Sequence, residues 1–222
     1  MECINNSGFE SEDEDSEEMI RTDAVRKSWS LGNLTVKSIS DHWSAGIRAN
    51  ASSSSYSNLD FNLRLSPALE YDLFPYYQSN QRQLTALYGL SYIYNDYSDT
   101  TIYNKIEESL FEQSLDITFQ VQQKWGSANI SLGASHYFHD FSKNKMVIDG
   151  FLRIRLMKGL SLNLNAGVEF IHNQVALLRG RRSSSQIFLR LNELETNYRF
   201  DAGLGLSYTF GSIYNNVVNP RF

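Results

Sequence analysis

Apolar and polar side chains alternate at every second position in segment after segment of this chain, and this pattern strongly limits how it can fold. The alternation is clearest in residues 59–73, where the odd positions are all apolar and most even positions are polar or charged. Successive side chains of a β-strand point to opposite faces, whereas the apolar positions of an amphipathic helix recur about every 3.6 residues. The pattern therefore predicts strands with one apolar face and one polar face.

The same alternation recurs along most of the chain. It predicts about nine strands, within residues 29–39, 43–52, 59–73, 83–96, 114–125, 127–138, 146–157, 160–171 and 198–210. Most of these segments are longer than the strands of ordinary globular proteins, which average about 5–6 residues. At about 3.3 Å per residue and a tilt near 40°, about twelve residues rise roughly 30 Å, which is the thickness of a bilayer's hydrocarbon core.

These features predict an all-β fold, a transmembrane antiparallel up-and-down β-barrel. No apolar run reaches the length of about 18 residues that a helical membrane span needs. The mean hydropathy of −0.38 is compatible with a barrel, because its lipid-facing and lumen-facing residues alternate. A soluble ligand-binding barrel of the lipocalin type would show the same alternation with the two faces reversed, so that alternative stays open.

The links between the predicted strands alternate in length, which predicts their orientation. Short links are expected near residues 40–42, 124–127 and 157–159, with a somewhat longer one near 75–80, and they alternate with longer polar links at 53–58, 97–110, 139–145 and 173–194. Outer-membrane barrels have short periplasmic turns and longer external loops. We therefore expect an integral protein of a Gram-negative outer membrane, with its C-terminus in the periplasm.

Charge is distributed unevenly and suggests three parts. Residues 1–18 hold eight of the 25 acidic residues and no basic residue, so the rest of the chain has an excess of three basic residues. We expect residues 1–27 to form an acidic, mobile external loop or tail, residues 28–210 the barrel strands, and residues 211–222 a periplasmic C-terminal tail. This balance does not support nucleic-acid binding.

An odd number of strands predicts that the chain is a fragment. Single-chain bacterial barrels have even strand numbers. Residues 1–18 also lack the basic start and apolar run of a secretory signal peptide. We expect a twelve-strand parent with three further strands, although one or five further strands would also give an even number.

Residues 203–210, GLGLSYTF, resemble the terminal-strand signature of outer-membrane barrels. The tail 211–222, GSIYNNVVNPRF, resembles that of an uncharacterised family of bacterial outer-membrane β-barrel proteins. Further similar stretches occur at 41–46, 57–60, 67–71 and 135–144, and the similarity covers most of residues 28–222. The resemblance implies recognition by the barrel assembly machinery through Gly205, Leu206, Tyr208, Phe210 and Phe222, and implies no activity.

Charged residues of both signs follow the polar face of the predicted strands. These predicted lumen-facing charges are Asp60, Arg64, Glu70, Asp72, Asp116, Asp149, Arg153, Arg155, Glu169, Arg199 and Asp201. One interpretation is a polar channel with a passive, porin-like transport role. The other is a set of paired charges that fills a narrow barrel and gives it a structural role, since buried charges need partners.

The histidines provide the only sequence features that point toward an enzyme. His136 and His172 fall on the apolar face near strand ends, which would suit an outer-membrane lipid hydrolase, but no serine, histidine and acid spacing stands out. We therefore predict no enzyme activity, with the hydrolase as an alternative, and no cofactor or metal. Arg179, Arg181 and Arg182 could contact lipopolysaccharide phosphates, which together with membrane lipid are the expected partners.

Aromatic residues gather near the predicted strand ends, where amphipathic rings settle at membrane–water boundaries. The predicted girdle comprises Trp43, Tyr71, Tyr92, Tyr94, Trp125, Phe138, Tyr198, Tyr208 and Phe210.

Overall fold

The computed structural model describes residues 2–13, 16–180 and 193–210 and, within them, side chains from Arg26 onward. The described residues form one antiparallel sheet of ten strands and contain no α-helix. The strands are β1 (Glu2–Asp13), β2 (Ser16–Ser38), β3 (Trp43–Ser54), β4 (Leu59–Asp72), β5 (Arg82–Tyr97), β6 (Glu107–Gln123), β7 (Gly126–Tyr137), β8 (Asp140–Met157), β9 (Leu160–Ile171) and β10 (Tyr198–Tyr208). The prediction of an all-β, up-and-down antiparallel fold is confirmed.

Nine of these strands, β2 to β10, correspond to the nine that the alternation predicts. The additional strand, β1, pairs with the first half of β2 from Glu2 opposite Trp29 to Asp13 opposite Ser16. Both lie largely in residues 1–27, for which the sequence predicted a loop or tail. The acidic run there interrupts the apolar alternation, so the sequence pattern does not indicate a strand. Strand pairing, however, uses the backbone N–H and C=O groups, and every residue except proline carries both.

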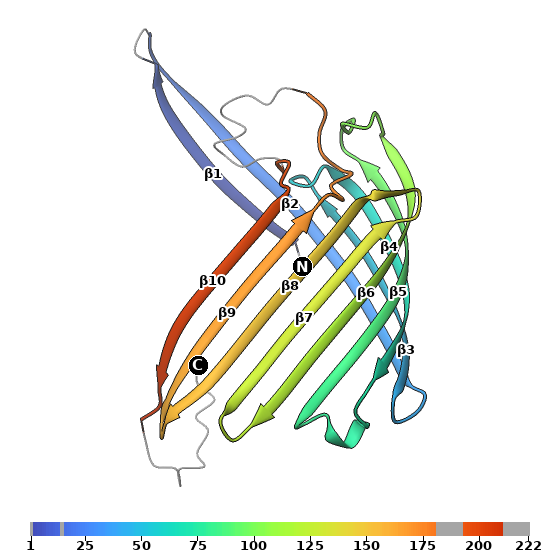
Figure 1. The fold of residues 1–222 in the computed structure, drawn as a ribbon. Helices are drawn as coiled ribbons and strands as arrows, with labels where there is room; N and C mark the ends of the chain where they lie inside the picture. Colours follow the sequence, from blue (N-terminus) through green and yellow to red (C-terminus); the bar gives the residue numbers. More distant parts are fainter. Residues whose placement is uncertain (1, 14–15, 181–192, 211–222) are drawn as a thin grey trace.

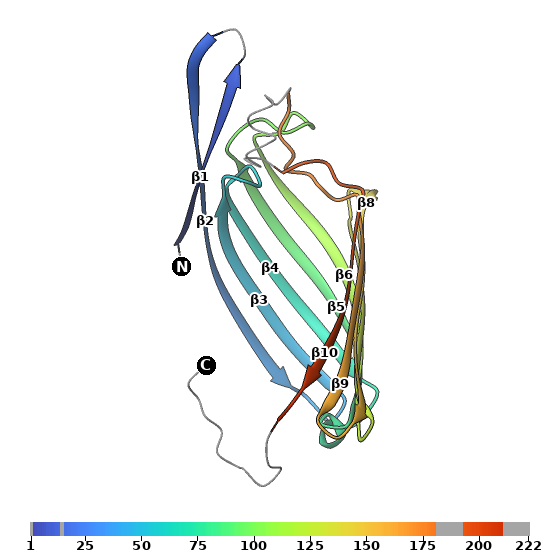
Figure 2. The same ribbon diagram turned by 90° about the vertical axis from the view of Figure 1, so that its left-hand side faces the viewer.

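Each strand pairs only with its neighbours in sequence, and the sheet curves strongly, as Figures 1 and 2 show. The curvature gives the sheet a convex face and a concave face. Within the described residues the sheet does not close, because β10 pairs only with β9, and residues 30–38 of β2 pair only with β3. Barrel closure is therefore not observed.

The register puts side chains of the same polarity together on each face. On the convex face, Leu65 of β4 lies opposite Tyr92 of β5, which lies opposite Phe111 of β6. On the concave face, Ser91 of β5 lies opposite Glu112 of β6. The period-two pattern of the sequence thus becomes an apolar convex side and a polar concave side.

The links partly follow the predicted lengths. At the upper end of Figure 1, the β5–β6 link spans residues 98–106 and the β9–β10 link spans residues 172–197. At the lower end, links 39–42, 124–125 and 158–159 are short, but the β4–β5 link spans 73–81 and contains the 3-10 helix η1 (Tyr76–Gln78).

The predicted link at 139–145 is wrong, because β8 already begins at Asp140. Tyr137 pairs with Asp140 across a tight turn, and His136 then pairs with Asn144. Residues 141–143 of β8 therefore have no partner in β7, and they form an irregularity in the hairpin that resembles a β-bulge.

Few side chains are fully buried, and those that pack together lie inside the upper end of the sheet. Ile93, Leu110 and Tyr137 point inward from β5, β6 and β7 and form a cluster with Val175 of the β9–β10 link. Most large apolar residues of the strands remain exposed instead.

Candidate functional site

The concave face encloses a cavity of about 550 Å³ that is bounded by β2 to β8. Four of the predicted lumen-facing charges line it, namely Arg64, Glu70, Asp116 and Asp149. Serines, threonine and small residues fill most of the positions between them. The cavity wall is therefore made mainly of charged, polar and small side chains, with Leu34, Val36, Leu87 and Val147 as its larger apolar members.

Arg64 and Glu112 form an ion pair across the upper part of this cavity. The guanidinium of Arg64 donates two hydrogen bonds to the Glu112 carboxylate, over 3.4 Å to Oε1 and 3.1 Å to Oε2. Glu112 is buried, whereas the Arg64 side chain is about one-third exposed. The carboxylate therefore depends on this bidentate partner, since a buried charge is costly without one.

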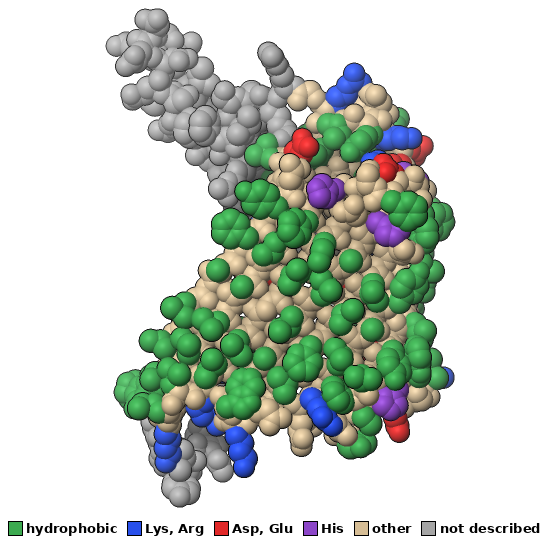
Figure 3. Space-filling view, viewed as in Figure 1, with side chains coloured by type: hydrophobic (Ala, Val, Ile, Leu, Met, Phe, Trp, Pro, Cys, Tyr) green, Lys and Arg blue, Asp and Glu red, His purple; other side chains and the backbone are tan. Residues whose placement is uncertain are grey.

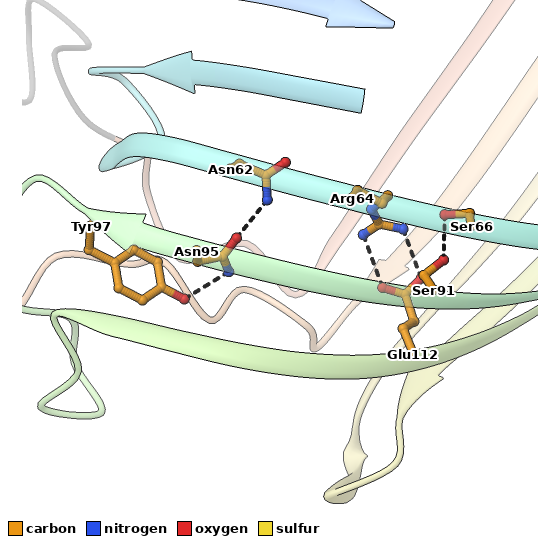
Figure 4. A network of polar contacts seen from close by, with 7 residues as sticks. All are labelled: Asn62, Arg64, Ser66, Ser91, Asn95, Tyr97 and Glu112. Carbon is orange, nitrogen blue, oxygen red and sulfur yellow. Dashed lines mark hydrogen bonds and ion pairs between the residues drawn. The ribbon is translucent and has the colours of Figure 1, made fainter. Parts of the chain in front are cut away.

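Further hydrogen bonds continue this network toward the upper end of the sheet, as Figure 4 shows. The hydroxyls of Ser66 and Ser91 lie 2.8 Å apart. The Asn62 amide donates to Asn95 Oδ1 over 2.6 Å, and the Asn95 amide donates to the Tyr97 hydroxyl over 3.0 Å. These bonds tie β4 to β5 inside the molecule.

A second charged group crosses β8, β9 and β10. Glu169 accepts from Lys145 Nζ over 2.6 Å and from Arg199 Nη1 over 3.3 Å. The predicted charges Glu169 and Arg199 are therefore brought together. Both groups of ion pairs lie around a second, upper cavity of about 800 Å³.

Lower on the concave face, aspartates lie across glycines of the neighbouring strand. A Cβ placed on Gly133 would lie 2.8 Å from Asp116 Oδ1. A Cβ on Gly167 would lie 2.7 Å from Asp201 Oδ1 and 2.8 Å from Asp149 Oδ1. The glycines thus leave room for carboxylates to lie flat against the sheet, which keeps the space above them free.

The remaining predicted charges have local roles near the two rims. Asp72 accepts from the backbone N–H groups of Phe74 and Leu84 and so shapes the β4–β5 link. Asp60 accepts from the Ser98 hydroxyl. At the lower end, Arg153 donates to Asn163 over 2.8 Å and Arg155 donates to the Lys124 carbonyl over 3.2 Å.

The sequence analysis missed three charged residues of the concave face, namely Arg48, Glu112 and Lys145. Glu112 and Lys145 stand in phase with Asp116 and Asp149, but both fall outside the segments predicted as strands. Arg48 lies in the weaker pattern of residues 43–52. Extending the strands by period would have found Glu112 and Lys145, and following the period within residues 43–52 would have found Arg48.

His136 and His172 contact amide side chains in the part of the chain that the structure describes. His136 contacts the Gln113 side chain over 2.5 Å, and His172 Nδ1 lies 3.3 Å from Asn144 Oδ1. None of the hydrogen bonds found in the described part of the chain joins either histidine to a serine hydroxyl. Among those residues, no group of three or more His, Cys, Asp or Glu could hold a metal ion.

Asp140 lies at the tip of the β7–β8 hairpin, beyond the apolar middle part of the convex face. Its carboxylate accepts two hydrogen bonds from one neighbouring residue. Its Oδ1 accepts from the Ser142 hydroxyl over 2.7 Å and from the Ser142 backbone N–H over 3.0 Å. These two bonds stabilise the carboxylate and lower the pKa of Asp140 below its ordinary value.

The convex face is apolar over most of its height. Figure 3 shows this face over the later strands, with hydrophobic side chains across the middle and charged side chains near the upper and lower ends. At the lower end, the rings of Trp43 and Tyr71 pack 4.8 Å apart. At the upper end, the hydroxyls of Tyr92 and Tyr94 bond to Ser109 and Glu107.

The residues of the predicted assembly signal lie mainly on the last strand. Leu206 and Tyr208 are exposed on β10, and the rings of Tyr208 and Phe210 meet edge to face at 4.4 Å. Gly205 has open space where a side chain would stand. Phe222 lies outside the described residues.

Comparison with known proteins identified no relative, since neither a protein-family model nor a curated protein matches the chain. Within the described residues, no helix is long and apolar enough to cross a membrane.

Proposed function

We propose that this chain forms an integral β-barrel of a Gram-negative outer membrane, whose polar interior provides a passive, porin-like path for small solutes. The supporting observation is the inverted polarity of the sheet. Apolar side chains such as Leu115 and Leu204 cover the convex face, where they are 42% and 74% exposed, while polar and charged residues line the concave cavity. This arrangement suits lipid outside and water inside.

Closure into a barrel is part of the proposal, and the two free edges support it. Inside a bilayer no water can satisfy the unpaired backbone groups of β10 and of residues 30–38 of β2. Each unpaired group would cost several kcal/mol, on the order of the cost of burying an unbonded amide. We therefore expect these edges to be paired by further strands. The ten strands of the described residues are already an even number, so a twelve-strand barrel would need two further strands rather than the three expected from a count of nine.

The long links at the upper end support an orientation with that end outside the cell, because outer-membrane barrels have longer external loops. Lys143 stands 3.9 Å above the Tyr103 ring, and Arg179 bonds to Asn104, so cations gather at the upper rim. Such groups would suit the phosphates of lipopolysaccharide. The exposed β10 residues Leu206, Tyr208 and Phe210 would be available to the barrel assembly machinery.

A soluble lipocalin-like barrel is the second candidate. It would require the apolar residues on the concave face, around its ligand. The lower cavity is lined by Arg48, Arg64, Glu70, Asp116 and Asp149 instead, which argues against an apolar ligand. The lipid hydrolase has no supporting contact among the described residues, because the neighbours of His136 and His172 are amides and aromatic rings.

The proposal is tested with the full-length protein, whose further strands would complete the barrel, by refolding it with lipid vesicles and then recording across planar bilayers. We expect flotation with the vesicles, a folded form in SDS that heating converts to a slower or faster band, and discrete ion-conducting steps. A protein that stays folded and monomeric in buffer without detergent or lipid would contradict the membrane assignment. Insertion without any conducting step would contradict the passive path.

A further inference from the structure

The β9–β10 link folds inward across the upper mouth of the curved sheet. Val175 and Leu177 are each only 6% exposed, although both lie in a long polar link. Val175 packs against Ile93, Leu110 and Tyr137, whose side chains project from the concave wall. A link that projected into solvent would have left these two apolar side chains in water.

Asn58, in the β3–β4 link, anchors this segment to two other links. Its amide donates to the Ala176 carbonyl over 3.1 Å and to the Asp99 carbonyl over 2.9 Å. Its Oδ1 accepts from the backbone N–H of Asp99 over 2.9 Å. The side chain is buried, and φ of Asn58 is 57°, a left-handed conformation that asparagine tolerates better than most residues.

A short backbone bridge fixes the next part of the segment to the β5–β6 link. Thr101 and Leu178 are antiparallel partners. Ile102 N–H donates to the Leu177 carbonyl over 2.8 Å, and Arg179 N–H donates to the Thr100 carbonyl over 3.0 Å. Thr101 itself is fully buried. The segment is thus held by the same kind of bonds that hold the strands.

Gln174 joins the two sides of the β9–β10 link. Its amide donates to Glu193 over 2.7 Å, and its Oε1 accepts from the Thr196 backbone N–H over 2.8 Å. Glu193 N–H donates to the Tyr56 carbonyl over 2.9 Å, so the returning part is also attached to the β3–β4 link. Three of the upper links are therefore tied together across the mouth.

The segment lies directly above the charged wall. Residues 173–177, together with Glu193, Leu194 and Thr196, form one side of the upper cavity of about 800 Å³. Arg64, Lys145, Glu169 and Arg199 form part of the other side. A solute in the upper cavity therefore has this segment on one side and the charged residues on the other.

We infer that residues 172–179 are a built-in plug that narrows the external mouth of the barrel and limits the passage of solutes. This inference rests on the proposed passive path and states where that path is restricted. Burial of Val175 and Leu177, the Asn58 anchor and the Thr101–Leu178 bridge hold the plug closed without any ligand. Passage of larger solutes then requires the plug to be displaced.

The test compares single-channel conductance of the full chain with that of the double variant Val175→Asp/Leu177→Asp, which puts two charges into the buried cluster. We expect roughly threefold or larger conductance for this variant, because the narrowest constriction controls conduction. Ile106→Asp is the matched control, since Ile106 is an exposed apolar residue of the β5–β6 link at the same end of the sheet and lines neither cavity. It should leave conductance unchanged. Vesicle insertion and heat-modifiability are measured for every variant.

A reversible lock keeps the test informative if the double variant changes the barrel itself. Thr101→Cys and Leu178→Cys are added in a Cys3→Ser background. The bonds around this pair mark it as a non-hydrogen-bonded antiparallel pair, whose Cα atoms lie about 4.5 Å apart, within the range of a disulfide. Oxidation should return the conductance of Val175→Asp/Leu177→Asp toward that of the unaltered chain, and reduction should raise it again.

The outcomes separate the plug from the path. Equal conducting steps in the unaltered chain and in the double variant, unaffected by oxidation, would overturn the plug and leave the passive path standing. Absence of conducting steps in every variant, despite insertion, would overturn the path itself and the plug with it.

Discussion

The two faces of β6 are built from adjacent residues of one strand, yet over residues 114–119 they differ in chemistry. Leu115, Ile117 and Phe119 lie on the convex face and are all exposed. On the opposite face, Ser114, Asp116 and Thr118 line the cavity. In an ordinary soluble domain the apolar row would be the buried one. Here the apolar row faces outward, and this difference is the basis for our proposal that the convex surface is in contact with lipid.

The largest predicted effect comes from placing a charge on the convex face. Leu115→Arg should destabilise the protein in vesicles by about 2–4 kcal/mol, because a cation near the bilayer midplane loses its hydration. Ser114→Arg, on the neighbouring concave position, is the matched control and should cost much less. Both are measured by urea unfolding in lipid vesicles. Equal losses for the two variants would remove the distinction between the faces.

The next effect concerns the charge pair of the concave face. Glu112→Ala leaves Arg64 without its bidentate partner and should lower the free energy of unfolding by about 1–3 kcal/mol. This loss is smaller than for a fully buried ion pair, because water reaches the partly exposed Arg64 side chain. The double variant Arg64→Met/Glu112→Leu removes both charges and should be less destabilised than Glu112→Ala. Urea unfolding of these variants and of Arg64→Met measures the coupling. Strictly additive losses would mean that the pair contributes no interaction.

A smaller effect is expected where carboxylates lie across a glycine. Gly167→Ala puts a Cβ within 2.8 Å of Asp149 and Asp201, so both side chains have to shift, and we expect a loss of about 1 kcal/mol. Gly205→Ala is the control on the same face, because nothing lies within 4 Å of its added Cβ. Unfolding of the refolded proteins compares the two. A loss at Gly205 as large as at Gly167 would show that glycine itself, not the carboxylates, matters.

The smallest effect is a pH dependence at the hairpin tip outside the apolar band. The pKa of Asp140 is lowered in the folded state, so its stabilising contribution is present above the unfolded pKa and is lost as the pH falls through the folded pKa. The protection factor of the Ser142 amide, which is the exchange rate of an unstructured amide at the same pH divided by the observed rate, should therefore fall in acid. Asp140→Asn should exchange faster at neutral pH and show a weaker pH dependence. Unchanged exchange in this variant would contradict the role of the carboxylate.

Much of the sheet could be predicted because strand periodicity is a local property of the sequence. The alternation of residues 59–73 predicted which residues of β4 lie on each face. The same reasoning located β5 to β10 to within a few residues, except that β6 and β8 begin earlier than predicted. Alternation alone could not tell which face is concave, since that depends on how the whole sheet curves. The polar lining of the cavity supplied that information.

The candidate site was less predictable because it depends on contacts between distant segments. The pairing of Arg64 with Glu112 requires the register of three strands. The inward fold of residues 172–179 depends on Asn58, Thr101 and Val175, which are far apart in sequence and meet only in the folded molecule. β1 could not be predicted either, because its pairing with β2 has no apolar period to signal it.

Nitroxide labels placed one at a time at positions 114–119, in a Cys3→Ser background and in lipid vesicles, test the orientation of the two faces most directly. Power-saturation electron paramagnetic resonance then compares collisions with oxygen, which concentrates in lipid, and with a water-soluble nickel complex. We expect oxygen to dominate at 115, 117 and 119 and nickel at 114, 116 and 118. Nickel accessibility at 115, 117 and 119, or no alternation along β6, would contradict an apolar convex face in contact with lipid.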